Sequence, residues 1–505
     1  MFLLKNGTVI IHDSHDAATG VKADVRVQGD KIIEIADHLT PKDGEEVIDC
    51  TDKLVAPGFV DTHRHMWNTA LRGRHGDNLL TDYLVQGILQ SSNYEPNDVF
   101  WGQLAGCLEA LDAGTTTVVD HSHLNYSPEH PKAALRATVA SGIRSIYGYC
   151  FTGRVATWSP FSFDANLLES WVLQTLGDLS QKAPFGDGRV TLGLAFDLWF
   201  LPKEILVPLF DQIKAFGIKH ITSHQTPPPP DHVSAGQPSS VQVMDSCGLL
   251  SSSVLLSHAN HLSPTDIALI KKRNAHISST PSLELQMAMG DPACFDHRRD
   301  IASQCSLGVD CHNVTLASMP AEMRTALSYG RGVVNKEYLK LGKYPVHMYK
   351  SVQEVYALGT ICGARAVGME KEIGSLAVGK KADIIILDSL APHMIAGAQH
   401  DPVTAIVMHS TPRDITTTMV DGVIRKRDGV LLPIQATQDV HHYTEGLPSE
   451  VSWIEVAKQV LRTRETIQAR IEKTDLEAAG QTARAMFGYG DDRLLDSLSG
   501  ERLSL

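Results

Sequence analysis

The chain has 505 residues, of which 43% are hydrophobic and 20% are charged, a composition that excludes a disordered or fibrous protein. Lysine and arginine total 45 against 58 aspartate and glutamate residues, and the net charge of −13 argues against nucleic acid or an anionic membrane as the main partner. The eight cysteines show no paired spacing, which argues against a disulfide scaffold and indicates a reducing compartment.

No apolar run is long enough to cross a membrane. The first residues, MFLLKNGTVIIHD, lack the apolar core and cleavage site of a signal peptide. We therefore expect a cytoplasmic protein that neither spans nor binds a membrane.

Short strands separated by turn signals are predicted at both flanks of the chain. In residues 1–57 the β-branched or apolar runs are Phe2–Leu4, Thr8–Ile11, Val25–Val27 and Lys31–Ile35. Residues 370–435 hold similar runs at Ala382–Leu387, Ala405–Met408 and Thr416–Val420. Two separated blocks of the same character can join, so we predict one small β-sandwich domain built from both flanks.

Between the flanks, eight short and nearly all-apolar runs alternate with longer helical stretches. They are Gly58–Asp61, Thr115–Asp120, Arg144–Tyr149, Val190–Phe196, Ile218–Ser223, Val254–Ser257, His276–Ser279 and Cys305–Val309. Such runs are typical of parallel strands buried on both faces. Eight of them predict an α/β fold, a (β/α)8 TIM-like barrel over residues 58–369.

Two further segments have distinct compositions. The linker Thr226–Gln237 contains four consecutive prolines, Pro227–Pro230, and is predicted to be a stiff loop. Residues 436–505 are predicted to be an appended helical tail, with a helix over Val451–Lys473.

Polar residues with metal-binding chemistry follow several of the predicted barrel strands. His63 and His65 lie two apart at the end of a strand, and because side chains alternate along a strand they point the same way. His224, His258 and Asp310 each follow another apolar run. The carboxyl ends of barrel strands carry the active site. Imidazole and carboxylate suit a divalent first-row metal, so the pattern predicts a metal site there.

The chain resembles the amidohydrolase superfamily, in particular the branch with cytosine and adenosine-derivative deaminases and triazine hydrolases. The matching stretches are PGFVDTHRH at 57–65, TALRG at 69–73, AGTTTVVD at 113–120, LSHANHL at 256–262, SLGVD at 306–310 and GSLAVGKKADIIILD at 374–388. The resemblance covers roughly residues 1–430 and leaves the tail outside it. It implies a hydrolase that acts on a non-peptide C–N bond of a cyclic or aromatic small molecule.

The resemblance also implies roles for single residues. His63, His65, His224 and Asp310 would hold one divalent ion, with Zn²⁺ as the first choice and Fe²⁺ or Mn²⁺ as alternatives. Asp310 would act as general base, and His258 would stabilise the negative charge that develops on the substrate. The resemblance further implies a homo-oligomer, by family likeness a dimer, with a small-molecule substrate.

One position departs from the deaminase pattern. The deaminases carry a proton-shuttling glutamate three residues after the third histidine ligand, where this chain has Pro227. Other residues are candidates for contact with substrate or for proton transfer: Glu284, His121, His123 and Trp67. For Glu284 the competing interpretation is a solvated loop residue or a salt bridge.

Two alternatives remain open from the sequence. The lost glutamate motivates a non-hydrolytic metal-dependent lyase, dehydratase or isomerase on the same scaffold. A non-catalytic scaffold protein is the second alternative, although such a protein has no need to keep the metal-binding positions.

Overall fold

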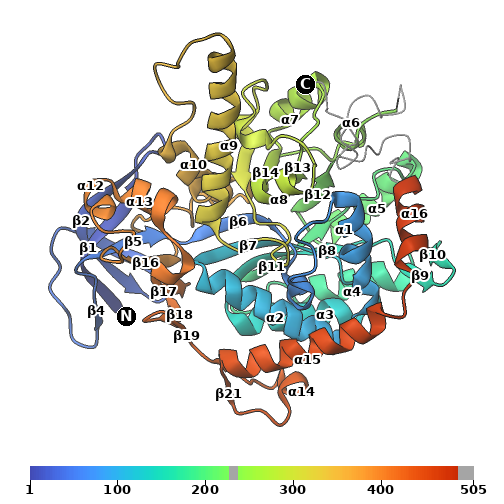
Figure 1. Ribbon diagram of the computed structural model, residues 1–505. Helices are drawn as coiled ribbons and strands as arrows, with labels where there is room; N and C mark the ends of the chain where they lie inside the picture. Colours follow the sequence, from blue (N-terminus) through green and yellow to red (C-terminus); the bar gives the residue numbers. More distant parts are fainter. Residues whose placement is uncertain (227–236, 487–505) are drawn as a thin grey trace.

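The computed structural model describes residues 1–226 and 237–486. Its centre is an eight-stranded parallel sheet rolled into a barrel, and a second, nine-stranded sheet lies beside it (Figure 1). None of the helices in the described part of the chain combines the length and apolar character needed to cross a bilayer. The proline run Pro227–Pro230, predicted to be a stiff loop, falls outside the described residues.

The barrel strands follow one another in chain order, each parallel to the next. They are β6 (Phe59–Arg64), β7 (Thr115–Ser122), β8 (Arg144–Cys150), β11 (Val190–Ala195), β12 (Ile221–Gln225), β13 (Val254–His258), β14 (His276–Ser279) and β15 (Cys305–Leu307). The first and last strands meet where the Asp310 N–H donates to the His63 carbonyl at 2.8 Å, which closes the barrel. All eight predicted strand positions are confirmed, and their apolar character follows from burial on both faces.

Helices surround the barrel and its carboxyl end (Figure 1). They are α1 (Leu80–Gln86), α2 (Pro96–Asp112), α3 (Glu129–Ser141), α4 (Ser170–Ser180), α5 (Lys203–Ala215), α6 (Ser240–Ser246), α7 (Pro264–Arg273), α8 (Pro281–Gln286), α9 (Met319–Lys340), α10 (Val352–Leu358) and α11 (Ile361–Ala366). Helix α7 shows why the chain turns helical where it does. Ser263 and Asp266 form a capping box around Pro264, and Asn274 ends the helix in the left-handed conformation.

The two flanks of the chain join in the nine-stranded sheet. The N-terminal flank supplies β1 (Phe2–His12), β2 (Ala18–Gln28), β3 (Lys31–Ala36), β4 (Glu46–Asp49) and β5 (Lys53–Pro57), and the C-terminal flank supplies β16 (Ile384–Asp388), β17 (Ile415–Val420), β18 (Val423–Arg427) and β19 (Val430–Leu431). The seam is antiparallel, with Ile385 of β16 opposite Ala56 of β5. A composite β unit is therefore confirmed, while the domain boundaries at residues 57 and 370 stay a prediction.

One predicted strand is wrong. Ala405–Met408 lies in the helix α13 (Pro402–His409), which follows the short helix α12 (Gly397–His400). The Asp401 side chain accepts hydrogen bonds from the N–H groups of Val403 and Thr404, and Pro402 occupies the first turn. Periodicity cannot assign a short buried apolar run to a strand or a helix. The Asp401–Pro402 pair before the run is the sequence signal that favours a helix here.

The C-terminal segment is helical but closely packed. It holds α14 (His441–Thr444), α15 (Trp453–Ile471) and α16 (Leu476–Met486), and a short ladder between β20 (Ile434–Gln435) and β21 (Glu450–Val451) fastens its start. Helix α15 lies against α2 (Figure 1), where Val456 and Ile467 are fully buried and Arg470 donates to Asp98 at 2.8 Å. The predicted helical character is confirmed for residues 436–486, which pack on the barrel and contribute to its core, while a separate tail over residues 436–505 stays a prediction.

Truncation after residue 370 is expected to give insoluble protein. The deletion removes β16–β19, so the edge of β5 and the apolar face that includes Val9, Val25 and Val55 would meet solvent. The soluble fraction and the circular dichroism of the truncated chain, beside those of the full chain, measure the effect. A soluble, folded product ending at residue 370 would contradict the role of the composite sheet.

Candidate active site

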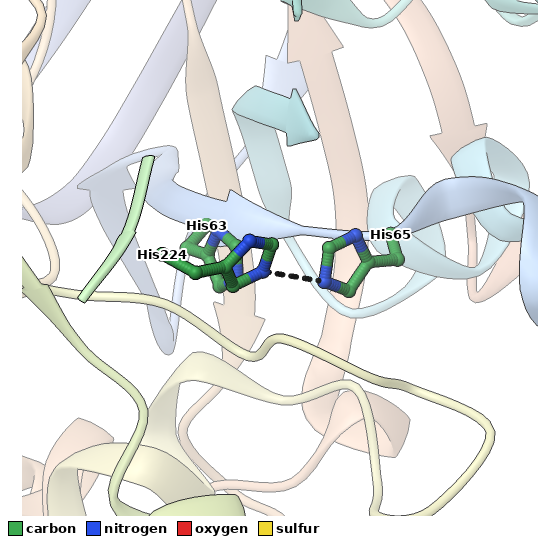
Figure 2. A group of neighbouring side chains, drawn as sticks. All are labelled: His63, His65 and His224. Atoms are coloured by element: carbon green, nitrogen blue, oxygen red, sulfur yellow. Dashed lines mark hydrogen bonds between the residues drawn. The ribbon is translucent and has the colours of Figure 1, made fainter. Parts of the chain in front are cut away.

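Four histidines and one aspartate meet at the end of the barrel where the strands terminate. His63 and His65 come from the end of β6, His224 from β12 and His258 from β13, while Asp310 follows β15. The Asp310 Oδ1 atom lies 3.4 Å from His63 Nε2 and 3.1 Å from His65 Nε2. The Nε2 atoms of His65 and His224 are 3.3 Å apart (Figure 2). The predicted residues thus form one cluster.

Hydrogen bonds at Nδ1 hold the imidazole rings of His63, His65 and His224, whose Nε2 atoms face the cluster. His63 Nδ1 lies 2.8 Å from the Ser257 hydroxyl, and His65 Nδ1 lies 2.7 Å from the His121 carbonyl oxygen. His224 Nδ1 lies 2.8 Å from an Asp197 carboxylate oxygen. Such partners fix a ring's orientation and tautomer, and they are the usual support of metal-binding histidines.

This tautomer pattern tests whether the residues fit a cation. A nitrogen that faces a carbonyl or carboxylate oxygen must donate its proton, so the Nε2 atoms of neutral His65 and His224 carry lone pairs. Two lone pairs that face each other at 3.3 Å repel, and a cation bound by both nitrogens would relieve this repulsion. His63 Nε2 is buried without a hydrogen-bond partner, and burial lowers the pKa of His63 well below its ordinary value. The three nitrogens and the Asp310 carboxylate therefore suit a divalent metal ion.

Asp310 is held in an unusual backbone conformation. Its φ of 63° lies in the left-handed region, which costs free energy in a non-glycine residue and persists where surrounding contacts impose it. In this conformation the Asp310 N–H donates the barrel-closing hydrogen bond to the His63 carbonyl. Burial alone would raise the pKa of Asp310, but the adjacent imidazoles of His63 and His65 hold that pKa well below its ordinary value. The carboxylate is thus ionised.

His258 stands on the other side of the aspartate. Its Nε2 atom lies 3.8 Å from Asp310 Oδ2, and its Nδ1 atom lies 2.9 Å from the Thr280 hydroxyl and 3.5 Å from Glu284 Oε1. Glu284 is fully buried in α8, where its carboxylate also accepts the Thr280 N–H at 2.8 Å. Glu284 is therefore buried rather than solvated, and its contact with His258 matches the other competing interpretation, a salt bridge.

Asp197 is the site residue that sequence reasoning missed. Its carboxylate lies 2.8 Å from His224 Nδ1 and 3.2 Å from His121 Nε2. Burial alone would raise the pKa of Asp197, but these two imidazoles outweigh it and hold the pKa well below its ordinary value. The available signal was its place two residues after β11, the same strand-end position as the other site residues.

The cluster opens into a cavity of about 720 Å³. Of the predicted residues, His65, His123, His224, His258 and Asp310 line it. Trp67 is instead fully buried against Tyr94, and neither His121 nor Glu284 is part of the lining. Among the four predicted substrate or proton-transfer residues, His123 alone reaches the described cavity wall. Pro227, the residue that replaces the deaminase glutamate, lies outside the described residues.

The closed parallel barrel and the histidine–aspartate cluster at its carboxyl end define the class of metal-dependent barrel hydrolases. The sequence profile of the amidohydrolase family matches residues 54–191 and 229–425, so the chain belongs to that family, and its relatives include deaminases, which hydrolyse C–N bonds other than peptide bonds. The predicted resemblance is confirmed.

Characterised relatives are similar to most of this chain. The 5'-deoxyadenosine deaminase of Methanobrevibacter smithii is 26% identical over 80% of this chain and 88% of its own length. The 5-methylthioadenosine/S-adenosylhomocysteine deaminase of Moorella thermoacetica is 28% identical over 78% of this chain and 86% of its own.

Solved structures share the fold. A Xanthomonas campestris adenosine deaminase with bound zinc has a TM-score of 0.74 and 19% identity, covering 93% of this chain and 98% of its own. The atrazine chlorohydrolase of Arthrobacter aurescens, also in complex with zinc, has a TM-score of 0.72 and 19% identity, covering 92% of this chain and all of its own.

Proposed function

We propose that this protein is a zinc-dependent hydrolase that cleaves a C–N bond of a cyclic or aromatic small molecule. The observation that carries the proposal is the convergence of three imidazole nitrogens and one carboxylate at the floor of a cavity large enough for such a substrate. Family membership and the zinc in two structural relatives support the same reaction class.

His63, His65, His224 and Asp310 would hold one divalent ion, for which Zn²⁺ is our choice, with Fe²⁺ and Mn²⁺ as alternatives. When bound, such an ion makes water a nucleophile near neutral pH. Asp310 accepts the proton of the attacking water, a role for which its carboxylate is ionised and adjacent to the ligands.

His258 acts on the substrate side of the reaction. It lines the cavity, and its Nε2 atom is directed to the same space as the free Asp310 oxygen. From there it can hydrogen-bond to the oxygen or ring nitrogen on which negative charge develops. Thr280 and Glu284 fix the ring from behind, so we assign Glu284 as a positioning residue for His258.

His123 is the candidate for contact with the substrate ring or leaving group. Its ring lies 4.2 Å from that of His65 between centroids, and it forms part of the cavity lining. The Thr152 hydroxyl donates to the His123 carbonyl at 2.7 Å and helps to fix this backbone. His121, which pairs with Asp197, serves the ligand shell rather than the substrate.

We also propose that the enzyme is a cytoplasmic homodimer. All eight cysteines are free, as expected in a reducing compartment. The mass of the native protein in solution, measured by light scattering, tests the dimer, and a monomer at assay concentrations would contradict it.

Ammonia release from adenosine, 5'-deoxyadenosine, guanine or cytosine is expected to be weak or absent. A poor leaving amine needs protonation, and Pro227 cannot transfer a proton where deaminases use glutamate, a contribution of about 10²–10⁴-fold in rate. Substrates whose leaving group departs unaided, or cyclic amides that open without losing an amine, should react better.

To test this function, zinc-loaded protein is incubated with the nucleobase and nucleoside compounds, and with compounds that have a good leaving group or a cyclic amide. Ammonia release and product mass are measured. A gain of one water in the product supports hydrolysis, whereas a product of unchanged mass would identify an isomerase. Rapid ammonia release from the nucleobase or nucleoside compounds would overturn the argument from Pro227.

A further inference from the structure

The cavity above the metal-binding cluster has a polar part and an apolar part in its lining. Its floor is polar, with His65, His224, His258 and Asp310. Its outer part is walled mainly by apolar side chains from separate segments. These are Leu80 and Leu84 of α1, Ile88 and Leu89 just after it, Phe163, Leu167, Leu198, Met287 and Met289. We call this outer part the apolar chamber.

Three of the polar side chains that border the apolar chamber, those of Asp164, Gln225 and Ser240, already have partners in the protein. Asp164 is ion-paired with Arg154 at 2.7 Å and also accepts the Asn166 N–H at 2.9 Å. The Gln225 side-chain carbonyl accepts the Ser240 hydroxyl. A substrate hydroxyl buried here would lose its bonds to water, and the described wall offers few unengaged groups to replace them.

The outer wall is held in place by the C-terminal helix α16. Ala479 and Ala483 of α16 are buried in one apolar cluster with Val85, Leu89 and Phe163, together with Phe161 and Trp158 of the hairpin formed by β9 (Val155–Trp158) and β10 (Phe161–Phe163). Figure 1 shows α16 beside α1 and this hairpin. Two residues of the cluster, Leu89 and Phe163, also line the cavity. Helix α16 thus shapes the chamber, although none of its described residues is part of the cavity lining.

We propose that the apolar chamber binds an alkyl or aryl arm of the ring substrate and selects against a hydroxyl-rich arm such as ribose. This inference rests on the proposed function for the place of the reacting ring, but it concerns binding rather than turnover. Apolar walls favour each buried methylene of the arm, and unpaired hydroxyls oppose binding of the sugar. The chain would therefore differ in substrate from its adenosine-derivative deaminase relatives.

Two ligands with one ring and different arms test the proposal. 9-Hexyladenine and adenosine share the purine, and their dissociation constants with zinc-loaded, full-length protein are measured by calorimetry. We expect the hexyl compound to bind about tenfold tighter or more. Equal affinity, tighter binding of adenosine, or binding of neither compound to zinc-loaded protein would overturn the proposal. Because binding is read without turnover, a failure of the hydrolase assignment would leave this result intact.

A matched pair of variants locates the effect. Phe163→Ser removes an aromatic wall of the chamber and is expected to abolish most of the preference for the hexyl arm. Phe161 lies two residues away on the same strand and in the same cluster, but outside the cavity lining. Phe161→Ser is therefore expected to keep the preference for the hexyl arm. Bound zinc reports that each variant is folded. An equal loss in both variants, or none in Phe163→Ser, would contradict the chamber assignment.

Discussion

Replacing both His63 and His65 by alanine is expected to remove the bound metal ion and to abolish activity. The change deletes two of the three clustered histidine ligands, which are also the two that lie next to Asp310, and leaves His224 and Asp310 without a complete site. Three protein ligands are the usual minimum of a catalytic zinc site, so the remaining pair should not retain the ion.

Metal content by mass spectrometry of the purified variant, together with turnover, measures this effect. His297→Ala is the control, because this histidine pairs with Glu337 away from the cluster. Full metal occupancy in the double variant would refute the ligand assignment.

Asp310→Asn is expected to lower the rate by about 10²–10⁴-fold or more at saturating substrate. An amide cannot accept the proton of the attacking water, and it also weakens the charge that balances the three imidazoles. The variant should keep part of its metal because the histidines remain. The rate per bound metal ion, rather than the total rate, is therefore the quantity to compare with the unaltered enzyme.

Glu284→Gln gives a useful contrast to this variant. Glu284 acts through His258 and does not line the cavity, so its replacement should keep the metal and cost less than the loss of Asp310. For Asp310→Asn, the contradicting outcome is a rate per bound metal ion close to that of the unaltered enzyme. This result would exclude Asp310 as the general base.

The sequence by itself determined the barrel and the main cluster. Buried parallel strands need short apolar runs, and eight such runs are visible without any structure. His63, His65, His224, His258 and Asp310 each stand where such a run ends. Because all strands of a parallel barrel end at the same face, position along the chain was enough to predict that these residues meet.

Tertiary structure decided what depends on neighbours distant in the chain. Asp197 follows β11 like any polar residue after a strand, and only the approach of His121 and His224 makes it part of the site. Whether Glu284 is solvated or buried beneath His258 was likewise settled by packing.

The same holds for the outer wall of the cavity, where α16 meets α1 and the β9–β10 hairpin, both of which lie more than 300 positions earlier in the sequence. Apolar periodicity shows that a helix will bury one face, but not which segment will cover that face. The residues that follow each strand are a local property of the sequence and can be read from it. Which segments pack against one another is determined only when the whole chain has folded.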